Sequence, residues 1–220
     1  MALAFPLALN QFWDLLPVER ATFDLPETME TSRTRSGEVL MAEKAARLWT
    51  GEIGLGLMSR SEVALVRPLI NLLRSSAGSF LVASKEAMLP QRDPTGALLG
   101  AAAANVKLAS VTAREITLGG LPVGYTLSRD DLIAWTYGTN PVRYAVHQVV
   151  SHTVSAGSNG ITGLIEVVPP VRAGTAVDTP AFLQKPACKA IILPDNFQAG
   201  TTRRGGWVEG MSFRWQQTFR

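Results

Sequence analysis

Hydrophobic and polar residues alternate with a period of two along several short segments, a pattern typical of half-buried β-strands. The clearest case is the segment 48–57, where every second residue is apolar or glycine: Trp49, Gly51, Ile53, Leu55 and Leu57. Polar residues and further glycines fill the opposite face. Gly51, Gly54 and Gly56 predict bulges in this strand, or the close approach of another backbone.

A β-hairpin is predicted before this strand, because residues 28–35 and 38–48 flank a Ser36-Gly37 turn. Its second strand is ambiguous, since residues 41–48 also suit a helix. A helical turn or a strand is expected at residues 12–16. Three prolines in the first thirty residues argue against a long helix there.

One convincing helix is predicted within residues 59–77. Ser59 and Glu62 form a capping-box pattern, and four apolar residues follow at helical spacing: Val63, Val66, Ile70 and Leu73. Pro68 should kink this helix or split it, and Gly78 is well placed to end it. A short strand, 80–83, is expected next.

A second unit is predicted after a loose stretch rich in proline, glycine and alanine, residues 86–110. Turn residues separate five expected strands there: 114–118, 123–127, 131–137, 142–154 and 161–168. Five short strands suggest a small barrel or sandwich, with an OB-like barrel as one candidate. Residues 179–186 are the expected exit linker, and 187–193 and 206–219 two last strands.

The composition limits the classes of protein to which this chain can belong, but it does not indicate a reaction or a ligand. The chain has 220 residues, 46% hydrophobic and 18% charged, and carries a formal net charge of +3. Its basic residues are scattered apart from two pairs, Arg33/Arg35 and Arg203/Arg204, so sequence-specific nucleic-acid binding is not expected. No signal peptide or membrane span is predicted. The single cysteine, Cys188, is interpreted as a buried strand residue.

No arrangement of residues predicts catalysis, a cofactor or a metal. His147 and His152 are five apart on a predicted strand, which puts them on opposite faces; both are interpreted as polar surface residues. Asp130 and Asp131 adjoin at a turn, where aspartates commonly cap or bend the chain. Glycine-rich phosphate loops, serine-hydrolase elbows and zinc motifs are missing from the sequence. A non-enzymatic protein is expected, although residues far apart in sequence can still form an active site.

The order of several short motifs resembles the distal tail proteins of siphophages. In the first half these are Trp49-Thr-Gly51, Ser59-Arg-Ser-Glu62 and Gly78-Ser-Phe80-Leu81. Further on, Gly119-Gly120-Leu-Pro-Val-Gly124, Val167-Val-Pro-Pro-Val-Arg172 and Gly205-Gly-Trp-Val-Glu-Gly-Met-Ser-Phe213 are similar to the middle and the closing strand of those proteins. The resemblance covers most of residues 30–216. Residues 1–30 and Pro68 fit it poorly.

This resemblance implies a mainly β protein with one short helix. A discontinuous β-sandwich, residues 1–88 and 185–220, would form a ring, and an OB-like or galectin-like domain, residues 100–180, would be inserted in it. The implied function is structural: a homohexameric ring joining the tail tube to the tail tip in the virion, made in the host cytoplasm. Implied partners are further copies of the chain, the tail tube protein, the tail tip or hub protein, and the tape measure protein.

Several side chains are candidates for contacts with other subunits or with a ligand. Trp13, Trp49, Arg203 and Arg204 are candidates for the ring interface, because aromatic and arginine residues concentrate binding energy in interfaces. The alternative function is a carbohydrate- or receptor-binding module. Trp135 and Tyr137, on one face of a predicted strand, would be its contacts. The competing interpretation is that both residues pack in the core of the barrel.

Overall fold

The computed structural model describes residues 3–220 and is mainly β, with 39% of residues in strands and 12% in helices. This confirms the predicted fold class. The chain divides into two compact units, each discontinuous in sequence. One unit contains Phe80–Lys189 with the N-terminal segment through Trp13 and the residues Phe219–Arg220. The other contains Asp14–Ser79 and Ala190–Thr218.

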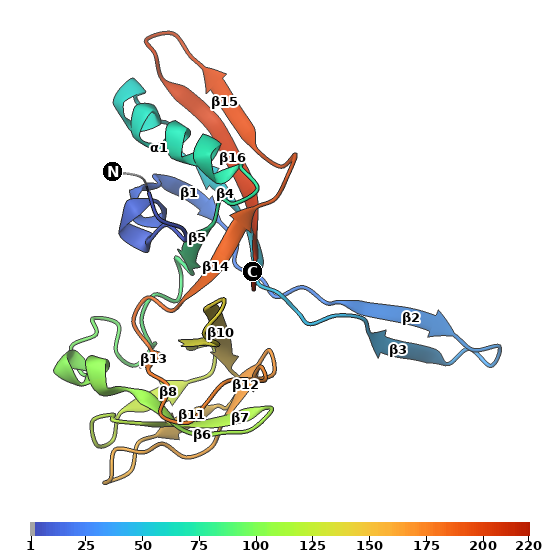
Figure 1. Cartoon of the computed structure of the whole chain (residues 1–220), viewed down its shortest axis with the longest axis vertical. Coiled ribbons are helices and arrows are strands. Elements are labelled where there is room, and N and C mark those ends of the chain that lie inside the picture. Colours follow the sequence, from blue (N-terminus) through green and yellow to red (C-terminus); the bar gives the residue numbers. More distant parts are fainter. Residues whose placement is uncertain (1–2) are drawn as a thin grey trace. The chain divides into compact units, whose positions relative to one another are not determined.

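The first sheet is formed by strands from both halves of the chain. Its order is β1-β4-β16-β14-β5, and β15 pairs with β16 off this path (Figure 1). Its strands are β1 (Val18–Ala21), β4 (Thr50–Leu55), β5 (Phe80–Ala83), β14 (Ala187–Ile192), β15 (Gln198–Thr202) and β16 (Val208–Gln217). The pairs β1–β4, β4–β16, β15–β16 and β14–β16 are antiparallel, and β16 pairs with β4 from Ser212 opposite Gly54 to Gln216 opposite Thr50.

One face of this sheet is apolar and buried, as the alternation in the sequence predicts. On β4 the buried side is Gly51, Ile53 and Leu55, and on β16 it includes Phe213 and Trp215. The Phe23 ring packs 4.7 Å from the ring centroid of Trp49 and 5.3 Å from that of Trp215. Gly51 allows this packing, because a Cβ there would lie 2.0 Å from the Thr22 carbonyl oxygen.

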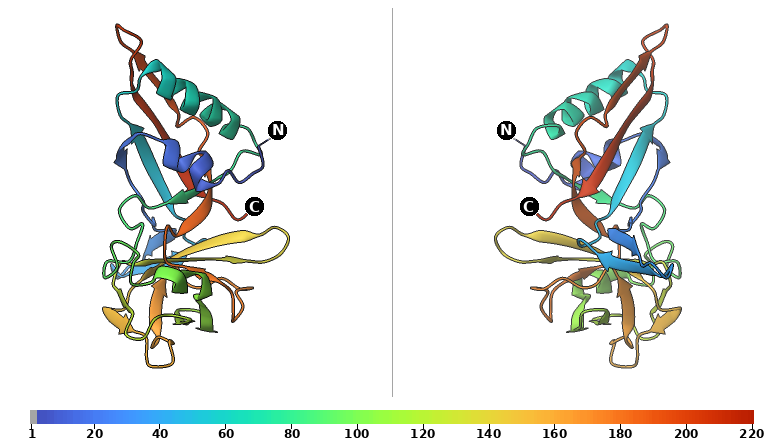
Figure 2. Two further views of the ribbon diagram at one scale, coloured as in Figure 1. Left: turned by 90° about the vertical axis from the view of Figure 1, so that its left-hand side faces the viewer. Right: turned by 90° about the vertical axis from the view of Figure 1, so that its right-hand side faces the viewer.

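The predicted helix is α1 (Arg60–Leu73), and it lies along strands β15 and β16 (Figure 2). Ser59 is its N-cap in a complete capping box, with the Ser59 backbone N–H donating to Glu62 Oε2 at 2.7 Å. A kink or a split was predicted at Pro68, and the split is wrong, because α1 continues through this residue. Pro68 and Ala64 are both exposed, so the carbonyl that loses its helical partner lies on the solvent side. Gly78 does not end the helix, which stops five residues earlier.

The second sheet curls into a nearly closed barrel in the order β13-β9-β10-β12-β7-β6. Its strands are β6 (Lys107–Val111), β7 (Glu115–Gly119), β9 (Leu132–Tyr137), β10 (Arg143–Val149), β12 (Ile165–Val168) and β13 (Ala181–Phe182). A bridge between Lys107 and Pro180 brings its two edge strands together. A small separate sheet pairs β8 (Thr126–Ser128) with β11 (Thr153–Ser155).

The remaining elements are three short 3-10 helices and one hairpin. The helices are η1 (Leu9–Gln11), η2 (Trp13–Leu15) and η3 (Gly100–Asn105). The hairpin pairs β2 (Met29–Arg33) with β3 (Val39–Glu43), and it is labelled in Figure 1. This confirms the predicted hairpin and decides its ambiguous second half, since residues 39–43 are a strand.

The sequence pattern did not predict some of the strands. Strands β1, β6, β13 and β15 were not expected, and the predicted strand 142–154 is two strands, β10 and β11. β15 has no buried residue and β13 only two residues, so neither carries a readable alternation. β6 lies in a stretch whose alanines and glycines favour a linker.

Candidate assembly surface

The hairpin β2–β3, residues 29–43, is a two-stranded arm whose strand residues are all exposed. Cross-strand pairing places Met29 beside Glu43, Thr31 beside Met41 and Arg33 beside Val39 on one face. Three large apolar side chains therefore lie in a row on that face: Met29, Val39 and Met41, of which Met41 is 67% exposed. The opposite face carries Glu30, Ser32, Leu40 and Ala42.

An arm of this kind lacks a stabilising partner in the described part of its own chain. A two-stranded hairpin is marginally stable in water unless its apolar face is covered by a third strand, a helix or another surface. Among residues 3–220, no element buries Met29, Val39 or Met41. An exposed apolar row bordered by charged residues is typical of a surface that binds another protein.

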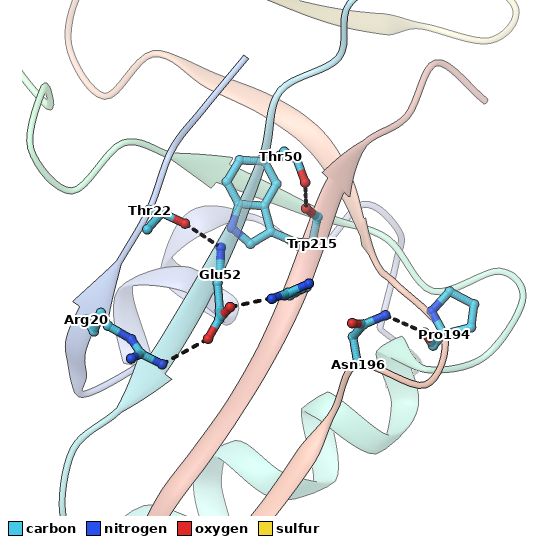
Figure 3. Close-up of polar contacts among 8 residues, drawn as sticks. Arg20, Thr22, Thr50, Glu52, Pro194, Asn196 and Trp215 are labelled. Carbon is cyan, nitrogen blue, oxygen red and sulfur yellow. Dashed lines mark hydrogen bonds and ion pairs between the residues drawn. The ribbon is translucent and has the colours of Figure 1, made fainter. Parts of the chain in front are cut away.

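The outward face of the first sheet is polar and held by a small ion-pair network (Figure 3). Glu52 on β4 accepts from Arg20 Nη2 on β1 at 2.9 Å through Oε1, and from Arg214 Nε on β16 at 3.0 Å through Oε2. The Glu52 backbone N–H donates to Thr22 Oγ1, and Thr50 Oγ1 donates to the Trp215 carbonyl. The two arginines thus tie three neighbouring strands together. Because the pairs are exposed, each contributes at most about 1 kcal/mol.

A hollow of about 660 Å³ lies beside β1, β4, β15 and β16. We call it the glycine hollow, and it is lined by Glu19, Leu55, Gly56, Leu57, Gln198, Gly200, Thr201, Glu209 and Gly210. Gly200 and Gly210 both adopt left-handed backbone angles, with φ of +74° and +71°. Its two ionisable lining residues, Glu19 and Glu209, are both acidic.

The four residues predicted for a ring interface lie in two different settings. Trp13 and Trp49 are buried within their own units, Trp13 against Phe80 at 6.2 Å between ring centroids. Arg203 and Arg204 lie in the exposed turn that joins β15 to β16. Arg203 forms an ion pair with Glu209 at 2.5 Å, so it borders the glycine hollow.

Trp135 and Tyr137, the predicted ligand contacts, both lie in the core of the barrel. Trp135 is 1% exposed, and its indole N–H donates to Thr175 Oγ1 at 3.3 Å. Tyr137 is buried in the same cluster, and this burial raises the pKa of its hydroxyl. This arrangement corresponds to the competing interpretation of the sequence, in which both rings pack in the core of the barrel and do not contact a ligand.

His147 was predicted at the surface, and that prediction is wrong. It lies on the core side of β10, between the buried residues Ala145 and Val149, and its ring stacks on Trp135. Nδ1 bonds to the Pro169 carbonyl at 2.7 Å, whereas Nε2 has no hydrogen-bond partner among residues 3–220. Burial is the main reason why the pKa of His147 is lowered to about 4; the hydrogen bond to the Pro169 carbonyl opposes this shift, and the charge of Arg172 adds to it. His152, by contrast, is exposed as predicted.

Asp131 caps a turn, which confirms the interpretation of the Asp130-Asp131 pair. Its Oδ1 accepts from the Gln91 N–H at 2.8 Å and its Oδ2 from the Ser128 N–H at 2.7 Å. Burial raises the pKa of this carboxyl despite these bonds. Asp130 adopts a φ of +77° beside it, the conformation of a sharp turn.

Residues 3–220 contain neither a cluster of metal-binding side chains nor a helix suited to span a membrane. No group of three or more histidine, cysteine, aspartate and glutamate side chains is arranged to hold a metal ion. No helix in this range is both long and apolar enough to cross a membrane. Cys188 is fully buried on β14, as predicted.

Sequence reasoning identified the hairpin but neither its exposure nor the glycine hollow. The alternation of Met29, Thr31 and Arg33 indicates a strand without telling which surface covers it. Gly200 and Gly210 are more than 140 residues from Glu19 and Gly56 in the sequence, so only folding brings them together. The cluster Gly205-Gly206 and Gly210 marks irregular backbone there, and this is the one signal that was available.

No protein-family model matches this chain, and no curated protein matches it.

Proposed function

We propose that this chain is a structural subunit of a phage tail, the distal tail protein, and that copies of it close a hexameric ring joining the tail tube to the tail tip. The observation that carries this proposal is the arm, residues 29–43. Its row of Met29, Val39 and Met41 is exposed in a single chain and needs a second surface to become buried. In a ring, that surface belongs to the neighbouring subunit.

Two further features support an assembly function. Contacts between different surfaces of identical chains repeat around a closed ring, and closure leaves no free strand edge to promote aggregation. The order of motifs in the sequence resembles that of siphophage distal tail proteins. On this proposal the chain acts without catalysis, and its partners are copies of itself, the tail tube protein, the tail tip protein and the tape measure protein.

The experiment is to size the purified full-length chain by light scattering and to class-average electron micrographs of it. A hexameric mass and sixfold averages are expected. A protein that stays monomeric at every concentration would contradict the proposal.

A triple variant of the arm, Met29→Ser, Val39→Ser and Met41→Ser, tests the observation itself. The rings should be lost while the melting temperature of the chain stays within a few degrees, because these side chains contact no core. The matched control is Glu30→Ser with Ala42→Ser on the opposite face, which should leave the rings intact. Rings that survive the triple variant would remove the arm from the interface.

The second candidate function is a carbohydrate- or receptor-binding module in the barrel unit. One observation favours it: a hollow of about 260 Å³ lined by Arg92, Leu98, Pro122, Val123, Gly124, Tyr125 and Thr126. Binding of the full-length chain to a glycan panel tests it. Loss of that binding in Arg92→Ala, with unchanged rings, would assign the hollow to a ligand.

A further inference from the structure

The barrel unit carries a small hollow with a mainly apolar wall, formed by residues 92, 98 and 122–126, which we call the barrel hollow. Its volume of about 260 Å³ is below the roughly 300–1,000 Å³ of sites that enclose a whole cofactor or a drug-sized ligand. A space of this size suits a single large side chain better than a whole small molecule.

The wall of the barrel hollow is held in place by the buried residue Asp93, which is 1% exposed. Its Oδ1 accepts from the Leu98 N–H at 3.1 Å, and its Oδ2 accepts from the Tyr125 hydroxyl at 3.4 Å. The Gly124 N–H donates to the Ala156 carbonyl at 2.9 Å, which fixes the turn at residues 122–126. Because the hollow is already formed, little conformational entropy is lost when it is filled.

The rim of the barrel hollow is apolar and exposed. Leu98 is 65% exposed and Val123 is 71% exposed, although both are large apolar side chains. Nothing lies within 4 Å of a Cβ built on Gly124, so no side chain fills the hollow at this point. Exposed apolar residues around a preformed hollow are typical of a site that receives an anchor side chain from another protein.

The two hydroxyl groups of the lining are already engaged within the chain. The Tyr125 hydroxyl donates to Asp93, and Thr126 Oγ1 donates to the Gly124 carbonyl at 3.0 Å. A saccharide is held by several polar groups that are free to bond its own hydroxyls. The barrel hollow offers few of these, so its lining favours an apolar occupant over a sugar.

Arg92 is the one charged residue of the lining, and its exposed side chain forms no hydrogen bond or ion pair with residues 3–220. A guanidinium beside an apolar hollow complements a carboxylate that lies next to an apolar side chain. We propose that the barrel hollow takes up one large apolar side chain of a partner peptide, and that Arg92 pairs with an acidic residue next to it. This inference rests on the second candidate function, and it makes the partner of that site a protein.

Titration of the isotope-labelled full-length chain with blocked dipeptides tests the proposal by NMR. N-acetyl-leucyl-aspartate amide should shift the amide signals of Leu98, Val123 and Gly124, with a dissociation constant on the order of 1 mM for so small a ligand. N-acetyl-leucyl-asparagine amide lacks the carboxylate and should bind about threefold to fivefold more weakly. N-acetyl-seryl-aspartate amide lacks the apolar side chain and should bind about tenfold more weakly or worse.

Variants of the chain locate the contact, and all four change exposed side chains, so the fold is retained. Val123→Ser should weaken binding of the leucyl-aspartate peptide by about threefold or more, whereas Val177→Ser, at an exposed valine outside the lining, should not. Arg92→Glu should reverse the preference, so that N-acetyl-leucyl-lysine amide binds better than the aspartate peptide. Arg114→Glu, at an exposed arginine outside the lining, should keep the wild-type preference.

Unshifted amides at the hollow, at the highest soluble peptide concentration, would overturn the proposal. Equal binding of the aspartate and asparagine peptides would overturn it too, as would an Arg92→Glu variant with the wild-type preference. If glycans shift these amides and the peptides do not, this inference falls and the carbohydrate form of the second candidate function stands. If neither binds, the second candidate function falls as well. The hexameric ring is measured separately and stands or falls by its own experiment.

Discussion

The imidazole of His147 stacks on the indole of Trp135, with ring centroids 4.2 Å apart and planes within 7° of parallel. This pair forms part of the barrel core, and it leaves Nε2 of the histidine without a hydrogen-bond partner among residues 3–220. A proton added at Nε2 would therefore be buried without an acceptor, which makes the stability of the barrel sensitive to acid.

The first prediction concerns that sensitivity. His147 has a pKa of about 4 in the folded chain against 6.5 for an ordinary histidine, so the unfolded chain binds more protons between these values. The free energy of unfolding should fall as the pH drops from 6.5 toward 4, by up to about 3 kcal/mol. Urea unfolding at several pH values measures it.

His147→Phe should flatten this pH dependence, because it keeps a ring against Trp135 and removes the titrating group. The matched control is His152→Phe at the exposed histidine, which should keep the wild-type slope. Asp131, whose pKa is raised, titrates equally in both proteins, so the difference between slopes reports on His147. A slope unchanged by His147→Phe would contradict the prediction.

The second prediction concerns close packing at Gly51. A Cβ at this position would lie 2.0 Å from the Thr22 carbonyl oxygen and 2.8 Å from the Trp215 ring. Gly51→Ala should therefore lower the free energy of unfolding by about 3 kcal/mol or more, since backbone and a buried ring must move. At Gly54, on the same strand, the nearest atom to an added Cβ is 3.5 Å away, so Gly54→Ala should change it little. Thermal unfolding of both variants checks this contrast.

The third prediction concerns the start of α1. Ser59→Ala removes the side chain that accepts from the Glu62 N–H, and should cost about 1 kcal/mol. The Ser59 backbone N–H and, to a smaller extent, the Ser59 hydroxyl lower the pKa of the Glu62 carboxyl, so that pKa should rise part of the way in the variant, which keeps the backbone N–H. Chemical denaturation and NMR titration of Glu62 measure the two effects. Ser76→Ala, at an exposed serine beyond the helix, should change neither.

The fourth prediction concerns Cys188. The thiol is fully buried, and burial raises its pKa above the ordinary value, so the reactive thiolate is scarce in the folded chain. A thiol reagent should label it only as fast as the chain unfolds, and fully in denaturant. Rapid labelling of the folded protein at neutral pH would show that β14 opens readily.

The sequence predicted those parts of the fold in which local pattern and final burial agree. The alternation of residues 48–57, and that of the last strand with Phe213 and Trp215 on one face, indicated which face of each strand is buried. The structure confirms both. Ser59 and Glu62 marked the helix start correctly because capping acts over three residues. The split predicted as one outcome at Pro68 was wrong, since the cost of a helical proline depends on whether the freed carbonyl is exposed.

The candidate assembly surface shows the limit of such reasoning. Met29, Val39 and Met41 look like ordinary strand residues in sequence, and only the fold shows that residues 3–220 do not cover them. His147 looked like a surface residue because its polarity was weighed without knowing which face of β10 meets Trp135.

What the sequence determined by itself is the class of the fold, the helix, the hairpin and most strands, because hydrophobic period and capping are local properties of the chain. Tertiary structure alone decided that β4 pairs with β16 and that Gly56, Gly200 and Gly210 line one hollow. It also decided that Trp135 stacks on a buried histidine. These contacts join residues far apart in the chain, and they depend on packing that no local pattern encodes.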